Sequence, residues 1–231
     1  MKNLKFLILM AIYICSHVSY SQNCAEAFYT SKQGTRLSFE HYDDKNKLQS
    51  SQTQTMTFFK STAGGFEAVM SVAMKDKKDK VIFDNRNFNV KCNNGVFTMD
   101  LSSFYAGEVN SAKDMQMEVS GEGVSYPSNL AVGQSLPSGE NEIKMKSGNM
   151  TLMTFRFKEI NRTVEKKESI TTPAGTFECY KITSESEIKV LFKRTIKSAI
   201  WIAKGVGIVR TESYNKKGEV EGYMILTKID K

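Results

Sequence analysis

Histidine, tryptophan and proline are scarce in this chain of 231 residues, which has two histidines, one tryptophan and three prolines. His17 precedes the cleavage site predicted below, so His41 is the imidazole left for catalysis. A Ser-His-Asp or Cys-His group would need His41, and no serine lies in a Gly-x-Ser-x-Gly setting. His41 follows Phe39 and Leu37 at strand spacing. We therefore interpret it as a partly buried structural residue.

Metal and phosphate motifs are also missing. One histidine and scattered cysteines without a Cys-x-x-Cys do not make a zinc site, and no loop fits the calcium template. Gly205-Val206-Gly207 is not a phosphate loop, because a phosphate loop is followed by a helix. The residues after Gly207 have the pattern of a strand. We interpret it as a tight turn or bulge between strands. We expect no catalytic residue, no metal site and no cofactor.

Carboxylate pairs are the catalytic option that composition does not exclude. Glu185 and Glu187 would share one side of a strand, but Lys181, Lys189 and Lys193 surround them. This pattern indicates a solvated, charge-balanced face, so a carboxylate-based hydrolase is the less favoured alternative.

The N-terminus predicts export. Lys2 and Lys5 precede the uncharged apolar run 6–14, which is too short to span a membrane, and small residues follow up to Ser21. We predict a signal peptide at 1–21, followed by one β-rich domain at 22–231. No other apolar stretch is long enough for a transmembrane segment.

A cysteine that carries a lipid needs a Leu-like residue three positions earlier and small residues between the two. The residues before Cys15 and before Cys24 do not meet this requirement. We therefore expect an exported protein, periplasmic or associated with the outer envelope, that is not a lipoprotein. The net charge falls from +7 to +5 (7 − 2) when the two signal-peptide lysines are removed. With no arginine-rich block, we expect no nucleic-acid partner.

Four cysteines are present, of which Cys15 leaves with the signal peptide. An oxidising compartment permits one disulfide among Cys24, Cys92 and Cys179, and the odd number leaves at least one thiol free. We favour Cys24–Cys92, which would tie the mature N-terminus to a strand. Three unpaired and mostly buried thiols stay an open alternative, because spacing does not determine connectivity.

Apolar residues recur at every second position through most of the chain, as in Phe66, Ala68, Met70 and Val72. This alternation predicts strands with one dry face, and the short turn sequences between them favour antiparallel neighbours. The stretch 102–142 is rich in proline, glycine and serine. There we predict a short helix near Leu101–Gly107, an extended piece near 115–119 and a central crossover that divides two β-layers. The predicted fold is mainly β, a strongly curved antiparallel sheet or half-barrel.

Motifs spread in order over almost all of the mature chain resemble those of one family. They include 92–97 (CNNGVF), 132–137 (VGQSLP), 172–177 (TPAGTF) and Trp201 with Gly205-Val206-Gly207. The set resembles the TapB-like exported proteins of Bacteroidetes-type bacteria, which are built on a domain of unknown function. The resemblance implies a β-rich envelope protein without an assigned activity and supplies no catalytic residues. It also implies cysteines at the positions of Cys24 and Cys92.

We expect a noncatalytic binding or interaction role with an unknown envelope partner or hydrophobic ligand, and the ligand-binding residues are unknown. The alternative is a carrier that holds a lipid on the concave face of the sheet. Ten methionines remain after Met1 and Met10 leave (12 − 2 = 10), and flexible methionine suits adaptable apolar pockets. Methionine on strand faces is more often ordinary core. Met70 and Met153 are the residues chosen to separate these two readings.

Overall fold

The computed structural model describes residues 24, 28–30, 32–100, 115–190 and 192–231. The predicted signal peptide at 1–21 and the helix predicted near Leu101–Gly107 lie outside the described residues. Within them, almost every residue outside a turn belongs to a strand. No helix in the described part is both long and apolar enough to cross a membrane.

Thirteen strands form one sheet, in the order β6-β8-β9-β10-β11-β12-β13-β1-β2-β3-β4-β5-β7. The strands are β1 (Arg36–Asp43), β2 (Leu48–Thr62), β3 (Gly65–Asp76), β4 (Val81–Asn93), β5 (Val96–Asp100), β6 (Met115–Gly123), β7 (Ser125–Pro127), β8 (Gly139–Ser147), β9 (Met150–Thr172), β10 (Gly175–Lys189), β11 (Lys193–Ala203), β12 (Gly207–Tyr214) and β13 (Val220–Asp230).

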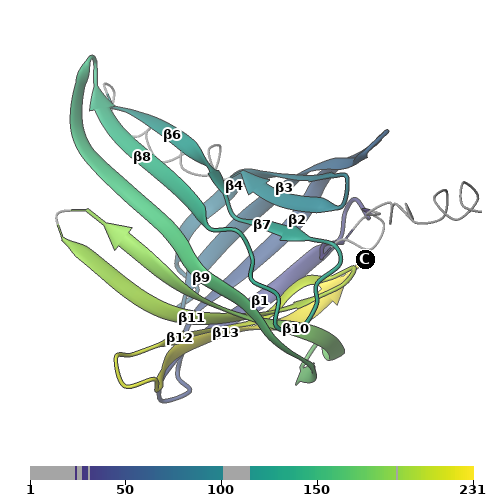
Figure 1. Ribbon diagram of the computed structural model, residues 1–231. Helices are drawn as coiled ribbons and strands as arrows, with labels where there is room; N and C mark the ends of the chain where they lie inside the picture. The colour runs from purple at the N-terminus through teal and green to yellow at the C-terminus, as the bar shows by residue number, and fades with distance from the viewer. Residues whose placement is uncertain (1–23, 25–27, 31, 101–114, 191) are drawn as a thin grey trace, which may run out of the picture.

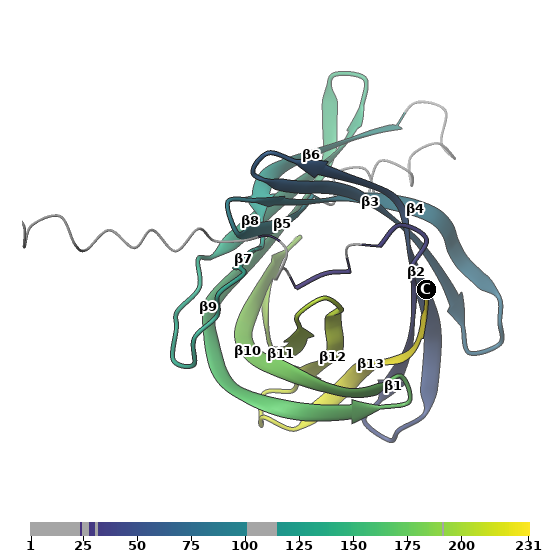
Figure 2. The ribbon, with the colours of Figure 1, turned by 90° about the vertical axis from the view of Figure 1, so that its right-hand side faces the viewer.

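The sheet curls into a nearly closed, barrel-like wall (Figure 1 and Figure 2). All neighbouring strands pair antiparallel. The two edge strands, β6 and β7, are separated in the chain by Val124 alone, so the edges are brought next to each other. The predicted mainly-β, curved antiparallel fold is confirmed, and the curvature goes beyond a half-barrel.

The predicted alternation places one dry row of side chains inside this wall. On β3, Phe66, Ala68, Met70 and Val72 are all buried, whereas the residues between them are more exposed. They pack with other interior residues of β2, β4 and β5 in one hydrophobic cluster. The side-chain period of two in a strand explains why a single row of each strand builds the core.

The interior has two ends, which the pairing register defines. The turns after β1, β3, β8, β10 and β12 lie at one end, drawn on the left in Figure 1; we call it the open end. The turns after β2, β4, β9 and β11 lie at the other end. There the described residues 28–30 lie inside the ring of strands (Figure 2), and we call it the plugged end.

Phe28 and Tyr29 are the plug. Phe28 is 2% exposed and meets Tyr180 edge-on, with ring centroids 5.8 Å apart. Tyr29 stacks on Phe97 at 5.3 Å. Phe28 is in the cluster formed by Leu130, Leu136, Val164, Ile182 and Ile202. A cavity of only about 60 Å³ is left beside the plug, so this end is a packed core.

A disulfide joins Cys24 to Cys92 and so fastens the chain just before the plug to β4. Gly65 makes room for it: a Cβ at this position would lie 2.6 Å from Cys24 Sγ and 2.1 Å from the Cys92 carbonyl oxygen. The third cysteine, Cys179, is a buried free thiol.

Candidate functional site

The open end of the interior contains a cleft of about 440 Å³. Its floor is the concave face of β9 to β13 and β1. The interior rows of the plugged end continue into this cleft. On β11, Ile202 is buried against Phe28, and Ile200 and then Ile196 lie farther along the same row, on either side of Ser198. The apolar part of the lining consists of Phe157, Ile188, Ile196, Ile200 and Met224.

Hydroxyl groups alternate with these apolar side chains. Ser198 lies between Ile196 and Ile200 in the interior row of β11, and its Oγ is 3.0 Å from Ser184 Oγ on β10. Ser186, on the next interior position of β10, donates a hydrogen bond to Glu159 at 2.5 Å. The polar part of the lining consists of His41, Ser186, Ser198, Thr211 and Ser213. The cleft is therefore amphiphilic, with aliphatic walls and small polar groups between them.

His41 stands in the interior row of β1, after Leu37 and Phe39, which are 2% and 1% exposed. Burial lowers the pKa of His41, and a hydrogen bond with the Gln52 side chain partly opposes this. Its Nε2 is buried and has no hydrogen-bond partner among the described residues. Its neighbours in the ladder are Ser50 and Met224, so no carboxylate flanks it there as a catalytic triad would require.

Glu212 borders the cleft, but its ladder partners are Ala199 and Tyr223, so its side chain lies in the outward row of the sheet. It is already engaged: Arg210 Nε lies 2.8 Å from Oε1, and the Tyr214 hydroxyl donates to Oε2 at 2.5 Å. The hydrogen bond to Glu212, together with burial as the larger cause, raises the pKa of Tyr214. This arrangement holds the carboxylate on the outward face, away from the hydroxyl groups of the cleft.

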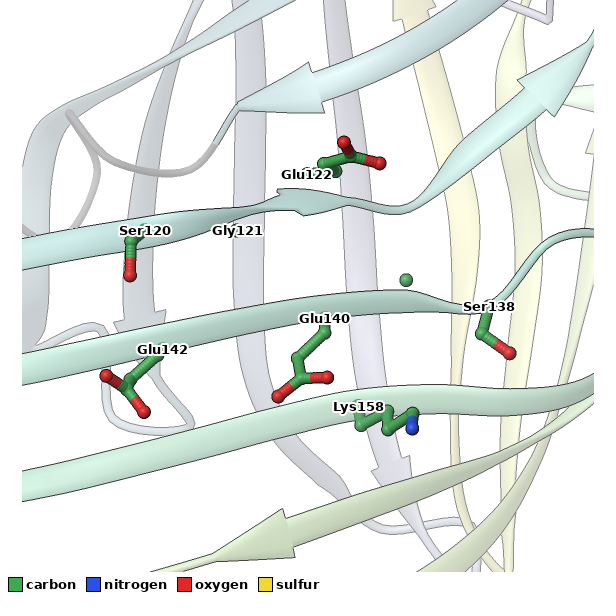
Figure 3. A pocket seen from close by; sticks show the side chains of 8 residues that line it. Ser120, Gly121, Glu122, Ser138, Glu140, Glu142 and Lys158 are labelled. Carbon is green, nitrogen blue, oxygen red and sulfur yellow. The ribbon is translucent and has the colours of Figure 1, made fainter.

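A second hollow, of about 500 Å³, lies where β6, β8 and β9 run side by side (Figure 3). Glu140 and Glu142 extend from β8 toward β9, whereas Glu122 on β6 points away from them. Glu142 is held by Arg156 and by Lys144, and these bonds lower its pKa. Glu140 stands opposite Lys158 in the register. Glu142 is therefore part of an ion-paired surface.

The glutamates singled out from the sequence lie on the outward row of β10. Glu187 pairs with Lys193 at 2.5 Å, and Glu185 accepts a hydrogen bond from Asn161 at 3.1 Å. They do not enter the cleft. Gly205 and Gly207 have φ of +70° and +106° and form the turn between β11 and β12, without a helix after them.

Met70 and Met153, the two methionines chosen from the sequence, lie in different environments. Met70 is fully buried in the plugged-end core, and Met153 is 41% exposed on the part of β9 that extends past β10. Neither lines the cleft. Sequence reasoning missed Ile196, Ser198 and Ile200. The sequence signal for the cleft was Ser198, a polar residue within the otherwise apolar interior row of β11.

Two solved structures have this fold. One is described as a putative exported protein with a YmcC-like fold from Bacteroides fragilis NCTC 9343; it is 22% identical, with a TM-score of 0.70 over 88% of this chain and 99% of that chain. The other is a putative lipoprotein from Parabacteroides distasonis ATCC 8503, also 22% identical, with a TM-score of 0.72 over 90% and 100%. Likeness at this identity shows the shared fold. No curated protein matches the sequence.

The expectation that the protein is not a lipoprotein is wrong. It rested on the residues before Cys15 and Cys24, but proteins of this fold are described both as exported proteins and as lipoproteins. A short pattern around one cysteine therefore does not exclude lipid attachment. The TapB-like name is not confirmed. The matching family model is the one described as DUF3108-like, over residues 32–226, and the chain belongs to this family.

Proposed function

We propose that this chain is an exported, noncatalytic protein of the cell envelope that binds an amphiphilic molecule with a hydrocarbon chain. The open-end cleft is the observation that carries the proposal. Its volume of about 440 Å³ lies within the range of ligand sites, roughly 300–1,000 Å³.

The size of the sheet supports a bound molecule. About eight strands already enclose an interior that side chains can fill, and wider walls leave space. This wall has thirteen strands, and the plug fills one end of it. Ile196 and Ile200 keep part of their surface accessible in the cleft. Covering such surface contributes about 25 cal/mol per Å².

The polar groups suit the head of such a molecule. Ser198, Thr211 and Ser213 supply hydroxyls that can both donate and accept, and His41 brings a buried nitrogen without a partner among the described residues. Glu212 lies in the outward row, where Arg210 and Tyr214 hold it, and Glu159 already accepts a hydrogen bond from Ser186 of the lining. This chemistry supports binding over catalysis.

The test is native mass spectrometry of the protein purified from a bacterial envelope fraction, together with binding of a fluorescent fatty acid. Ser198→Trp fills the cleft without burying a charge. Ser61→Trp, at an exposed position of β2, is the matched control. We expect a lipid-mass adduct and fatty-acid binding in the wild type and in Ser61→Trp, and a loss of both in Ser198→Trp.

Far-UV circular dichroism would verify that each variant is folded. A bare wild-type mass without fatty-acid binding contradicts the proposal. Equal binding by the two variants also contradicts it, because the ligand would then sit elsewhere.

A further inference from the structure

Large apolar side chains stand in water at the open end. Phe192, between β10 and β11, is 88% exposed, and Val190 beside it is 37% exposed. On the hairpin of β8 and β9, Met150 is 67% and Leu152 is 52% exposed. Figure 1 shows both hairpins projecting at the same end of the wall. Exposed apolar groups that gather on one side of a protein mark an interaction surface.

A basic hollow adjoins the hairpin of β10 and β11, which carries Phe192. It measures about 660 Å³ and is lined by Lys193, Arg194, Lys197, Lys216 and one carboxylate, Glu221. The formal charge of these five side chains is +4 − 1 = +3. Glu221 lies 3.9 Å from Arg194 and Glu187 pairs with Lys193, so Lys197 and Lys216 carry the positive excess of the hollow. The hollow follows Phe192 directly in the chain, because β11 begins at Lys193.

We propose that the open end docks onto a membrane surface rich in anionic phospholipids. Phe192 enters the acyl boundary, and the basic hollow receives lipid phosphate groups. An aromatic anchor flanked by lysine and arginine is the combination that holds proteins at such an interface, since apolar burial and attraction to anionic lipid add. Met150 and Leu152 form a second contact.

This surface goes beyond the proposed ligand and does not depend on it. The two sites nevertheless meet at Ile196, which lines both the cleft and the basic hollow. Docking in this orientation places the mouth of the cleft against the lipid surface.

The test is co-flotation of the full chain with two kinds of vesicle: equal parts of phosphatidylethanolamine and phosphatidylglycerol, or phosphatidylcholine alone. Phe192→Ser removes the anchor. Val132→Ser, which removes a 58% exposed valine between β7 and β8, is its control. Lys197→Glu with Lys216→Glu reverses the hollow. Lys32→Glu with Lys60→Glu makes the same charge change at the plugged end.

We expect the wild type to float with the anionic vesicles and to leave them at high salt. Phe192→Ser and the Lys197/Lys216 double variant should each lower the partition coefficient by roughly tenfold. The two controls should stay within about twofold of the wild type, as changes away from the contact should. Binding to neither vesicle overturns the proposal. So does an equal loss in each variant and its control, or capture of a protein partner by Phe192 without any vesicle binding.

Discussion

The two ends of the interior are built from the same strands, yet one is packed and the other is hollow. β1 carries Phe39 toward the plugged end and His41 toward the open end, and β11 carries Ile202 and Ile196 in the same way. At the plugged end Phe28 and Tyr29 come from outside the sheet and leave about 60 Å³. No described segment fills the other end, where about 440 Å³ is open.

The difference shows that strand pattern alone does not decide what a wall of this size encloses. Alternation makes a face that can be dry, and a separate element must then fill the space in front of it. The polar residues follow this division: serines enter the interior rows of β10 and β11 only beyond the reach of the plug. The plugged end therefore supplies stability, and the open end is left for the binding that we propose.

The largest effect is expected from emptying the plugged end. Phe28→Ala should lower the free energy of unfolding by about 3–5 kcal/mol, because a fully packed aromatic side chain is replaced by a cavity. Ile196→Ala at the open end should cost no more than about 1 kcal/mol, because its side chain already keeps part of its surface in water. Urea denaturation followed by circular dichroism measures both. Similar losses at the two positions would remove the distinction between the ends.

A somewhat smaller effect is expected from the disulfide that fastens the plug. Cys24 and Cys92 are 68 residues apart, and closing a loop of this length corresponds to about 4 kcal/mol in the chain-entropy account. Changing both cysteines to serine should therefore lower the free energy of unfolding by about 2–4 kcal/mol. The melting temperature of the variant should match that of the reduced wild type.

Combining this change with Phe28→Ala separates two roles of the bond. If it acts by holding the plug in place, the triple variant loses less than the sum of the two separate losses, because the plug is displaced only once. Strict additivity would show instead that the disulfide and the plug stabilise the protein independently.

Much of the wall could be read from the sequence, because alternation and turn chemistry are local signals. The buried row of Phe66, Ala68, Met70 and Val72 and the turn at Gly205–Gly207 follow directly from them. The near closure could not be predicted, because it depends on β7 pairing with β5 and β6 pairing with β8, which skips the chain order. Short strands such as Ser125–Pro127 carry almost no periodic signal.

The plug and the cleft were hidden for a related reason. Phe28 and Tyr29 precede the first strand and belong to no alternating run, so their burial is purely tertiary. The cleft is a space, and it exists because no described segment follows the plug into the open end. Its residues had ordinary strand patterns. The available clue was the presence of serines in the otherwise apolar interior rows of β10 and β11.

The smallest predicted effect concerns His41, where the open end meets the core. Burial lowers its pKa below the ordinary value of 6.5, so the folded state favours the neutral imidazole. As the pH falls through 6.5, the unfolded chain binds a proton at this position before the folded chain does, and the contribution of His41 to stability declines. Its ladder neighbours, Ser50 and Met224, carry no charge that would reverse the sign. His41→Gln should therefore lose less stability than the wild type between neutral and mildly acidic pH. The measurement is the difference between the urea unfolding free energies of the two untagged proteins over this range, because carboxylates that titrate in both cancel. A difference that does not change with pH would show that water reaches the imidazole freely, and that the hollow interior begins deeper than the position of His41.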